Sequence, residues 1–363
     1  MFEVTGKYGT AKVFSINRDA KAVDQIQTLM DQPFIAGSKV RIMPDYHWGA
    51  GCTIGFTANL GDYIIPNLVG VDIGCGMYVE SLGKVNFDLK EFDHVVHKIP
   101  AGFKSWKNPV ASVDFMRELI AWPEIKNSVI DVQVGTLGGG NHFIELDRDE
   151  ETGEIYLVIH SGSRNIGKQI AEHYQRIAER ACKADVPRQL KYLTGEEAAM
   201  YLHDMALCQR YAAFNRQTIC TLISDHFEVN GDSFQTIHNY INPQDHIIRK
   251  GAVSARKDER LIIPLNMRDG SILATGKGNP DWNYSAPHGA GRLLGRKEAQ
   301  RTLRMDEFKR SMKGIFSTTI AADTLDEAPL AYKPAREILD AVNDTVAIEA
   351  WLKPIYNFKA GRE

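Results

Sequence analysis

The sequence of 363 residues predicts an α+β fold, built as one domain over residues 1–363. Segments typical of strands and of helices do not alternate regularly along the chain, which favours this class over a doubly wound parallel sheet. No internal repeat, low-complexity tract or linker rich in Pro, Gly and Ser divides the sequence. With 44% hydrophobic and 25% charged residues, the composition is that of an ordinary globular protein.

Short strands separated by turns are expected in about the first 80 residues, where Gly and Asp interrupt apolar runs. The runs that predict these strands span residues 11–16, 39–44, 52–58 and 63–74. Residues 129–160 predict strands around a turn, and residues 231–275 predict strands and loops.

Helices are expected at residues 165–183 and 195–228, and further helical segments are expected after residue 295. The second helix follows the stretch TGEE, which predicts a capping box at its start. In such a box Thr194 accepts from the backbone of the first turn and Glu197 reaches back to the capping residue.

The segments 141–146 and 155–160 flank a polar turn that contains Gly153, and this arrangement predicts an antiparallel hairpin. If the hairpin is centred near Glu151, His142 and His160 become cross-strand neighbours on one face. Their Cβ atoms would then lie ~5 Å apart, close enough for both imidazoles to hold a metal. A slip of one residue in the register would break this pairing.

Five cysteines, an odd number with wide spacing, predict a reducing cytosolic setting rather than a disulfide framework. The N-terminal stretch lacks the charged and then apolar build of a signal peptide. No apolar run approaches the ~20 residues that a membrane span needs. We therefore expect a cytoplasmic protein without a membrane partner, in which Cys75 is a thiolate ligand or a nucleophile.

The net charge of −3 argues against a protein that wraps nucleic acid by bulk charge, but a local basic channel stays possible. Residues 292–313 are the candidate, because this segment contains eight basic and three acidic residues, a local net charge of +5. The alternative is that these residues form only a solvated helix face.

The stretch VGVDIGCGM (69–77) places Asp72 and Cys75 three residues apart among glycines, a setting that suits metal ligands better than packing residues. Five of the eleven histidines likewise stand beside Gly, Asn or Ser at predicted strand ends or turns. These are His47, His142, His160, His238 and His288. Oxygen, sulfur and nitrogen donors together fit manganese, zinc or iron, and two ions bridged by one thiolate would suit the set.

Two further patterns indicate phosphate chemistry. Three glycines precede His142 in LGGGNH, and such a run can present backbone N–H groups to a phosphate. HSGSR and HGAGR each place an arginine, Arg164 or Arg292, four residues after a histidine. A guanidinium group grips phosphate oxygens with two hydrogen bonds.

In this order, and over most of the chain, GVDIGCGM, GGGNHFIE, HSGSRNIG, IHN and HGAGR resemble the motifs of the RtcB family of RNA-splicing ligases. MPDYHWGAGCTIG resembles an early Pro-Asp-x-His-x-Gly segment of that family. The resemblance implies one domain in which mixed β-sheets and surrounding helices enclose a central metal site.

The resemblance also implies an activity. The family joins RNA ends that carry a 2′,3′-cyclic phosphate or a 3′-phosphate to 5′-hydroxyl ends, in tRNA splicing or RNA repair, with GTP and manganese as cofactors. A histidine attacks the α-phosphate of GTP and carries GMP as a phosphoramidate. The GMP then passes to the RNA 3′-phosphate, and the 5′-hydroxyl displaces it.

By motif, His288 is the nucleophile, and the ligands of two manganese ions are Asp72, Cys75 (bridging), His142, His160 and His238. The nucleotide pocket implied by the resemblance contains Asn141, His142, Phe143, Glu145, His238, Asn239, Pro264, Asn266, Met267, Ser271, His288, Gly289, Ala290, Gly291 and Lys359. Within it Asn141 resembles a phosphate contact, Glu145 a guanine-reading carboxylate and Lys359 a base-contacting lysine. Arg164 and Arg292 are expected to contact phosphate or RNA.

The stretch IPLNMRDGS (263–271) departs from the family's Ile-Pro-Gly-Ser-Met-Gly, because Leu265 and Asn266 replace Gly and Ser. Arg268 and Asp269 add charge to this loop. The changes predict an altered base specificity or RNA substrate and an intact metal centre, as in a divergent branch that repairs RNA.

Two other functions fit part of the pattern. A metal-dependent phosphohydrolase acting on RNA ends would use the same ligands without a nucleotidyl step, and the altered loop favours it. HGAGR argues against it, because a hydrolase needs no extra histidine there. A non-catalytic RNA-end-binding protein has no reason to keep a bridging thiolate.

Overall fold

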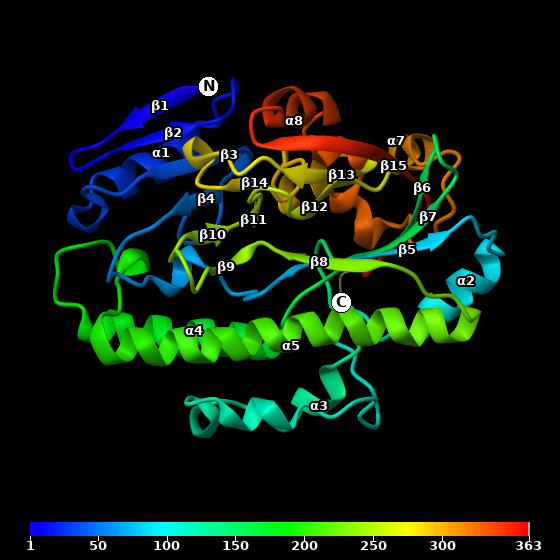
Figure 1. Ribbon diagram of the computed structural model, residues 1–363, viewed down its shortest axis with the longest axis horizontal. Helices are drawn as coiled ribbons and strands as arrows, with labels where there is room; N and C mark the ends of the chain where they lie inside the picture. Colours follow the sequence, from blue (N-terminus) through cyan, green and yellow to red (C-terminus); the bar gives the residue numbers. More distant parts are fainter. Residues whose placement is uncertain (362–363) are drawn as a thin grey trace.

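A sheet of six strands forms one part of the structure, a computed structural model that describes residues 1–361 (Figure 1). Its strands, in spatial order, are β1 (Phe2–Thr5), β2 (Thr10–Val13), β3 (Val40–His47), β4 (Ile54–Ala58), β10 (Ile248–Lys250) and β9 (Asn239–Ile241). The sheet is mixed, because β2 and β3 run parallel whereas their neighbours pair antiparallel. Three of the predicted early strands, at 11–16, 39–44 and 52–58, are thereby confirmed.

A second sheet has seven antiparallel strands and carries most of the site. Their spatial order is β12 (Arg260–Asn266), β13 (Gly270–Gly276), β15 (Val346–Lys359), β6 (Phe143–Asp149), β7 (Ile155–Ser161), β5 (Gly76–Gly83) and β8 (Ser233–Ile237). A small ladder joins β11 (Ala252–Ser254) to β14 (Ser285–Pro287). The last strand in chain order, β15, therefore lies in the middle of the sheet.

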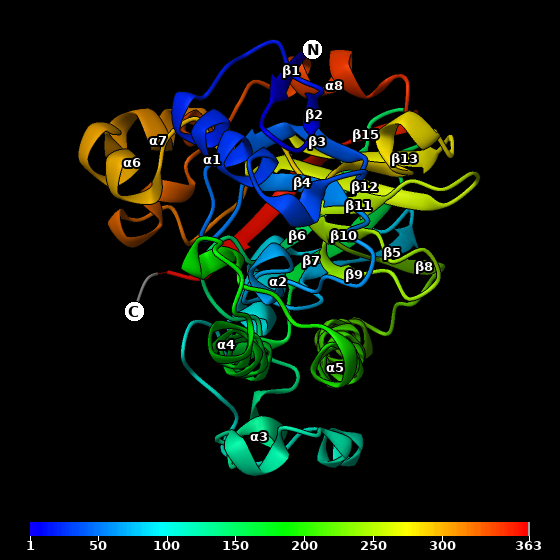
Figure 2. The same ribbon diagram turned by 90° about the vertical axis from the view of Figure 1, so that its left-hand side faces the viewer.

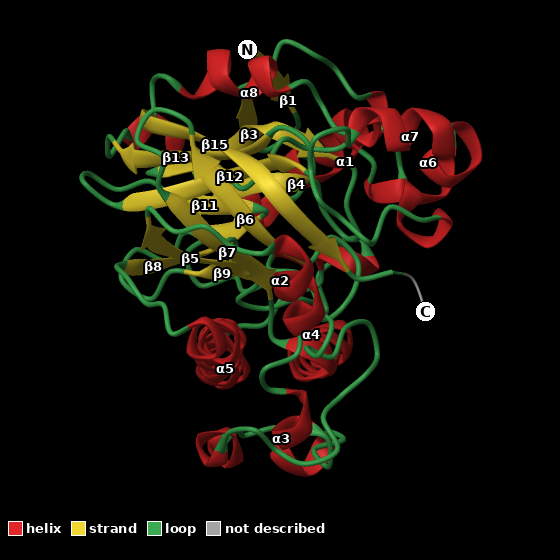
Figure 3. Cartoon of the chain, turned by 90° about the vertical axis from the view of Figure 1, so that its right-hand side faces the viewer, coloured by secondary structure: helices red, strands yellow, loops and turns green. Residues whose placement is uncertain are grey.

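The helices surround the sheets. They are α1 (Ala20–Met30), α2 (Leu89–Val96), α3 (Ile130–Gln133), α4 (Arg164–Ala181), α5 (Gly195–Phe227), α6 (Arg296–Thr302), α7 (Met305–Ser311) and α8 (Ala335–Val342). Figures 1 and 3 show α4 and α5 as a layer beneath the sheets, with α3 on the far side of that layer. Figure 2 shows α6 and α7 projecting to one side. The predicted α+β class is confirmed, and none of the described helices is long and apolar enough to cross a membrane.

The long helix α5 joins two cores because buried residues recur along it every three or four positions. Its first half packs Tyr201, Met205 and Cys208 into the core beneath the six-stranded sheet. Its second half packs Ile219 and Ile223 against the seven-stranded sheet. The same helix therefore fixes both sheets relative to each other.

Several predicted elements are wrong. Residues 63–74 form no strand: Pro66 opens a 3-10 turn, η2 (Pro66–Leu68), and only Ile64 pairs, in an isolated bridge to Leu193. The strands predicted within 129–160 begin only at Phe143, since α3 and a loop precede them. Thr194 occupies the N-cap of α5, but no side-chain hydrogen bond forms there, so the capping box is absent.

The prediction of helices after residue 295 missed β15. This strand pairs with β13 on one side and with β6 on the other, and both partners come earlier in the sequence. Pro354 argues against a central strand because proline cannot donate to the ladder. A register shift between Pro354 and Tyr356 accommodates it.

The hairpin of β6 and β7 is confirmed, but its predicted register is wrong by one residue. His160 pairs with Phe143, not with His142. Gly153 adopts a φ of 78° in the turn, a conformation that glycine adopts without strain. His142 lies just before the first residue of β6, so the alternation of the strand does not fix the direction of its side chain.

Candidate active site

The loop before β5 carries Asp72 and Cys75, and glycines allow it to lie close to its neighbours. The N–H of Cys75 donates to the carbonyl oxygen of Asp72 (3.2 Å), which closes a tight turn. Gly74 has a φ of 70°, and a Cβ atom there would lie 2.8 Å from the Cα of Gln209 in α5. Gly74 is thus required by the packing of the loop on α5, and Gly76 by the approach of β8, where a Cβ atom would meet the carbonyl oxygen of Thr236.

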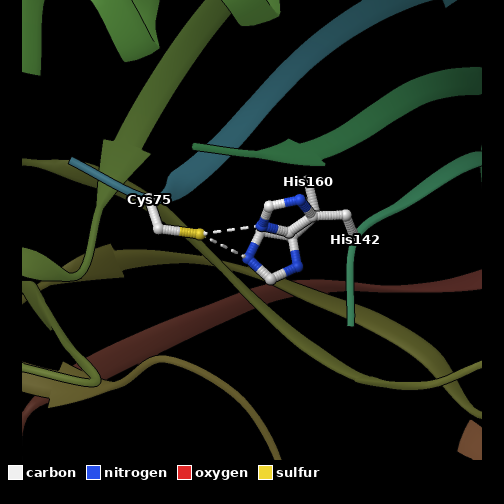
Figure 4. Close-up of side chains that lie close together, drawn as sticks. All are labelled: Cys75, His142 and His160. Carbon is white, nitrogen blue, oxygen red and sulfur yellow. Dashed lines mark hydrogen bonds between the residues drawn. The ribbon is translucent and has the colours of Figure 1, made fainter. Parts of the chain in front are cut away.

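The Sγ atom of Cys75 points at two neighbouring imidazoles (Figure 4). Its Sγ atom lies 3.4 Å from Nε2 of His142 and 3.3 Å from Nε2 of His160. The three ligand atoms lie within 4.8 Å of one another, and all three side chains are buried. The two histidines meet despite the shifted register, because His142 reaches the site from the loop rather than from the strand.

Backbone carbonyls fix the tautomer of both histidines. Nδ1 of His142 lies 2.9 Å from the carbonyl oxygen of Leu137, and Nδ1 of His160 lies 3.2 Å from that of Asn141. A carbonyl oxygen only accepts, so Nδ1 carries the hydrogen in each ring. The Nε2 lone pairs therefore face the thiol, as they do in metal-ligating histidines.

Asp72 extends this group with a carboxylate. Its Oδ2 lies 3.1 Å from Nε2 of His142, and its Oδ1 accepts from the N–H of Ser163 (3.1 Å). Burial opposes its ionisation, but His142 in its protonated form and the charge of Arg164 prevail and lower its pKa to about 2. Asp72 is therefore a charged oxygen donor beside the sulfur.

His238 lies next to the group without belonging to its tightest part. Its ring centroid lies 5.2 Å from that of His160 and 4.8 Å from that of His288. It is buried, and its Nδ1 has no hydrogen-bond partner in the described part of the chain. A buried nitrogen lone pair without a partner fits a metal ligand, because leaving it unpaired costs ~1–3 kcal/mol.

His288 follows β14 and is held by an aspartate that the sequence analysis did not assign to it. Its Nδ1 lies 2.7 Å from Oδ2 of Asp45, and its backbone N–H donates to the same oxygen (3.2 Å). Asp45 lies in β3 and is fully buried. Nε2 of His288 is thereby left as the nitrogen available for chemistry.

His288 opens into a cavity of about 1200 Å³. The predicted nucleotide residues that line it are Asn141, Phe143, Glu145, Pro264, Asn266, Met267, His288, Gly289, Ala290, Gly291 and Lys359. His142, His238, Asn239 and Ser271 are not part of its wall. Asn239 instead donates to the carbonyl oxygen of Asp72 (3.1 Å), and Ser271 is fully buried.

Glu145 lies in the wall of the cavity, where the side-chain amide of Asn357 donates to it. Burial raises its pKa to about 7, although the charge of Lys359 opposes this shift. Asp147, two residues further along β6, is also buried, and burial raises its pKa well above the usual range. Lys359 itself donates to Glu327 (3.0 Å) and to the carbonyl oxygen of Asn141 (3.3 Å).

The two predicted phosphate-contacting arginines make contacts inside the protein. Arg164 donates to the hydroxyl of Thr136 (3.2 Å) and to the carbonyl oxygen of Gly102 (3.1 Å). Arg292 donates to Glu327 (3.0 Å) and to backbone carbonyls, although it also lines the cavity. Each guanidinium is thus positioned by the protein, and contact with phosphate stays a prediction.

Arg216, which the sequence analysis missed, supports the metal group from beneath. It lies in α5, is fully buried, and donates through Nη1 to the carbonyl oxygens of Gly74 (2.8 Å) and Ser161 (2.9 Å). These two carbonyls lie next to Cys75 and His160 in sequence. Burial lowers the pKa of Arg216 to about 10, against the pull of Cys75 and Asp72. In the sequence it is one of the two arginines of a long helix, and nothing beside it indicates a role.

The altered stretch, which ends β12 and turns into β13, lines the cavity through Leu265, Asn266 and Met267. Asn266 accepts from the backbone of Arg268 and Asp269 (3.0 Å each), and those two residues form an ion pair (2.8 Å). The added charges are therefore neutralised within the loop.

Comparisons with known proteins give a consistent result. A family model described as tRNA-splicing ligase RtcB matches residues 25–122 and 120–360. The chain is 31% identical to the RNA-splicing ligase RtcB of Escherichia coli K12, with 93% of each chain covered. It is 26% identical to the tRNA-splicing ligase RtcB of Nanoarchaeum equitans, over 93% of this chain and 91% of that one. The extent of these matches shows that the chain belongs to the RtcB family.

Proposed function

We propose that the protein is an RNA ligase that uses GTP and manganese to join an RNA 3′-phosphate or 2′,3′-cyclic phosphate end to a 5′-hydroxyl end. Membership in the RtcB family supports RNA ligation as the activity. The observation that carries the finer proposal is the pairing of His288 with the buried Asp45, inside a cavity and next to the histidines of the metal group.

The first step is the attack of Nε2 of His288 on the α-phosphorus of GTP. A P–N bond forms, the bond to the bridging oxygen breaks, and pyrophosphate leaves with the electron pair. Asp45 accepts the Nδ1 hydrogen bond and stabilises the positive charge that develops on the ring, as a carboxylate does in catalytic triads.

The GMP then passes from His288 to the RNA 3′-phosphate, and the P–N bond breaks. The 5′-hydroxyl oxygen attacks the activated phosphate, a phosphodiester forms, and GMP leaves. A cyclic phosphate is first opened by water to a 3′-phosphate. At the metal group, Asp72, Cys75, His142, His160 and His238 would hold two manganese ions, which supply positive charge for the phosphates.

The nucleotide is expected to bind between the wall of β6 and the segment after β14. Glu145, which can accept from guanine N1–H and from the exocyclic amine, is assigned to the base, with Lys359 beside it. The backbone of Gly289, Ala290 and Gly291 is assigned to the phosphates, with Asn141 opposite. Arg164 and Arg292 are assigned to orienting the phosphates or the RNA.

The test is the detection of a protein–GMP adduct. The protein is incubated with manganese and α-labelled GTP, and the labelled band is expected to survive alkali and to be lost in acid, as a phosphoramidate is. His288→Ala should remove the label and keep the bound metal. Asp45→Asn should slow labelling by about 10²-fold or more, because the ring loses its ionised partner.

The same experiment decides between ligase and phosphohydrolase. If the wild-type protein forms no adduct and still removes phosphate from RNA ends, the proposed ligase mechanism is wrong and a metal-dependent phosphohydrolase takes its place. Label that persists in the His288→Ala variant would move the nucleophile to another residue.

A further inference from the structure

One side chain at the rim of the cavity has no role in the steps above. Trp48 follows His47 at the end of β3 and lines the same cavity as His288. Its relative exposure is 56%, whereas that of Trp282 is 2% and that of Trp351 is 37%. Its indole N–H donates no hydrogen bond within residues 1–361. An aromatic ring that lines a cavity and is open to solvent is available to contact a ligand there.

The backbone that carries Trp48 is held in place. The side chain of Gln25 in α1 donates to the carbonyl oxygen of Gly49 (2.7 Å) and accepts from its N–H (3.2 Å). The buried Lys250 donates to the carbonyl oxygen of Ala50. The backbone that presents the indole is therefore held before a ligand binds, so a ligand that stacks on the ring meets little cost from ordering the loop.

Exposed charges of both signs line the same cavity: the carboxylates of Asp19 and Glu298, and three cations. Lys21 at the start of α1 and Lys297 and Arg301 in α6 line it, and all three are exposed. None of the three forms an ion pair in the described part of the chain. Arg292 and Arg296, in contrast, are paired with Glu327. The charges that remain free therefore lie on the rim, outside the buried network.

An aromatic ring and unpaired cations around one cavity are an arrangement that binds single-stranded nucleic acid: bases stack on the ring and phosphates meet the cations. We propose that Trp48 is the stacking platform for a nucleobase of a single-stranded RNA end, with Lys21, Lys297 and Arg301 as contacts for its phosphates. The choice of RNA as the occupant rests on the proposed function. The assignment adds a binding residue outside the metal group and the nucleotide pocket.

The test is a binding measurement that needs no catalysis. A fluorescein-labelled, single-stranded RNA of ten nucleotides with a 3′-phosphate is titrated with protein in the absence of GTP and manganese, and its anisotropy is followed. Trp48→Ala should raise Kd by about 5-fold to 100-fold, the loss typical of one stacked base. Trp48→Phe should keep most of the affinity because it keeps an aromatic face.

Matched controls separate stacking from general loss of surface. Trp351→Ala removes an exposed tryptophan that lies in β15 outside the cavity, and it should leave Kd unchanged. Blunt duplex RNA should bind Trp48→Ala and wild type equally, because its bases are already stacked. The double change Lys297→Gln and Arg301→Gln should reduce the slope of log Kd against log salt by roughly 0.7 for each phosphate that the protein no longer neutralises.

The outcomes are distinct. Equal RNA affinity of Trp48→Ala and wild type would overturn the proposal, and so would weaker GTP labelling with unchanged RNA binding, which would place the indole against the nucleotide. A change in oligomeric state of Trp48→Ala during sedimentation would show that another protein surface covers the ring. If RNA binding depends on Trp48 but no GMP adduct forms in wild type, this inference holds and the proposed ligase mechanism fails.

Discussion

The thiol of Cys75 is the donor on which the metal group depends, because both Nε2 atoms of His142 and His160 converge on it. Cys75→Ala is expected to lower metal affinity at least about tenfold and to abolish ligation, since no neighbouring atom replaces the sulfur. Metal content after dialysis, measured by mass spectrometry, gives the result. Cys208→Ala is the control, because that thiol is equally buried but lies in the core. Equal metal content in both variants would refute the assignment.

Glu145 predicts a pH dependence of nucleotide binding. Burial raises its pKa to about 7, so the carboxyl is neutral below that pH and ionised above it. Only the ionised form accepts both guanine donors, so GTP affinity should rise with pH and be about tenfold weaker at pH 6 than at pH 8. Calorimetric titrations at the two pH values measure this ratio.

Glu145→Gln serves as the reference in those titrations, because its side chain does not ionise. The variant should show a flatter dependence on pH and a smaller preference for GTP over ATP. An identical ratio in variant and wild type would mean that the pH effect arises in GTP itself and that Glu145 does not read the base.

The contributors to the site that were predictable from the sequence are those with a distinctive local setting. Asp72, Cys75 and the histidines stand among glycines and at strand ends, where side chains are free to bind a ligand. Asp45 reaches His288 across 243 positions of sequence. Nothing in its neighbourhood indicates a partner so distant, and the sequence analysis therefore assigned Asp45 no role.

At the scale of single elements, α5 acts on the site through Arg216. Arg216→Ala would leave the carbonyl oxygens of Gly74 and Ser161 buried without their donor. At ~1–3 kcal/mol for each unpaired group, unfolding in denaturant should show a loss of about 2–6 kcal/mol, together with weaker metal binding. Arg210→Ala is the control on the same helix, because Arg210 is exposed and only stacks on Phe115. A loss smaller than that of the control would contradict this role.

Elements whose residues interact locally were predicted well, and those that depend on distant partners were not. α4 and α5 follow from their own periodicity, and the hairpin of β6 and β7 follows from its turn. β15 is held by β13 and β6, so its own sequence, with Pro354 inside it, indicates no strand. The apolar run at 63–74 is buried as a turn, because burial alone does not distinguish a strand from a compact loop.

At the scale of the whole molecule, Glu327 joins segments that are distant in sequence. This buried carboxylate, in η7 (Ala322–Glu327), pairs with Lys359 of β15 and with Arg292 and Arg296 around the start of α6. Burial opposes its ionisation, but the three cations prevail and lower its pKa to about 2. The contribution of ionised Glu327 to the free energy of unfolding is therefore present above pH 4.5 and is lost as the pH falls towards 2.

Glu327→Gln should cost ~3–5 kcal/mol near pH 7, because three cations lose a buried partner. The difference from wild type should shrink as the pH is lowered from 4.5 towards 2, where the wild-type carboxyl also becomes neutral. Denaturant unfolding across this range measures it. Glu172→Gln, in an exposed pair with Lys168, should change stability by no more than ~0.5 kcal/mol at any pH. A constant penalty at all pH values would show that charge is not its origin.

The central position of β15 has a consequence for synthesis on the ribosome. All other strands of the seven-stranded sheet are translated before it, yet β12 and β13 are linked to β6, β7, β5 and β8 by ladder hydrogen bonds only through it. Until residues 346–359 have left the exit tunnel, we expect the nascent chain to hold two β-ribbons whose edges next to the place of β15 are unpaired. Such edges invite pairing with other chains. We expect nascent chains arrested before residue 346 to bind chaperones and to lack the metal site. Chains arrested only after residues 346–359 have left the tunnel should no longer bind the chaperones.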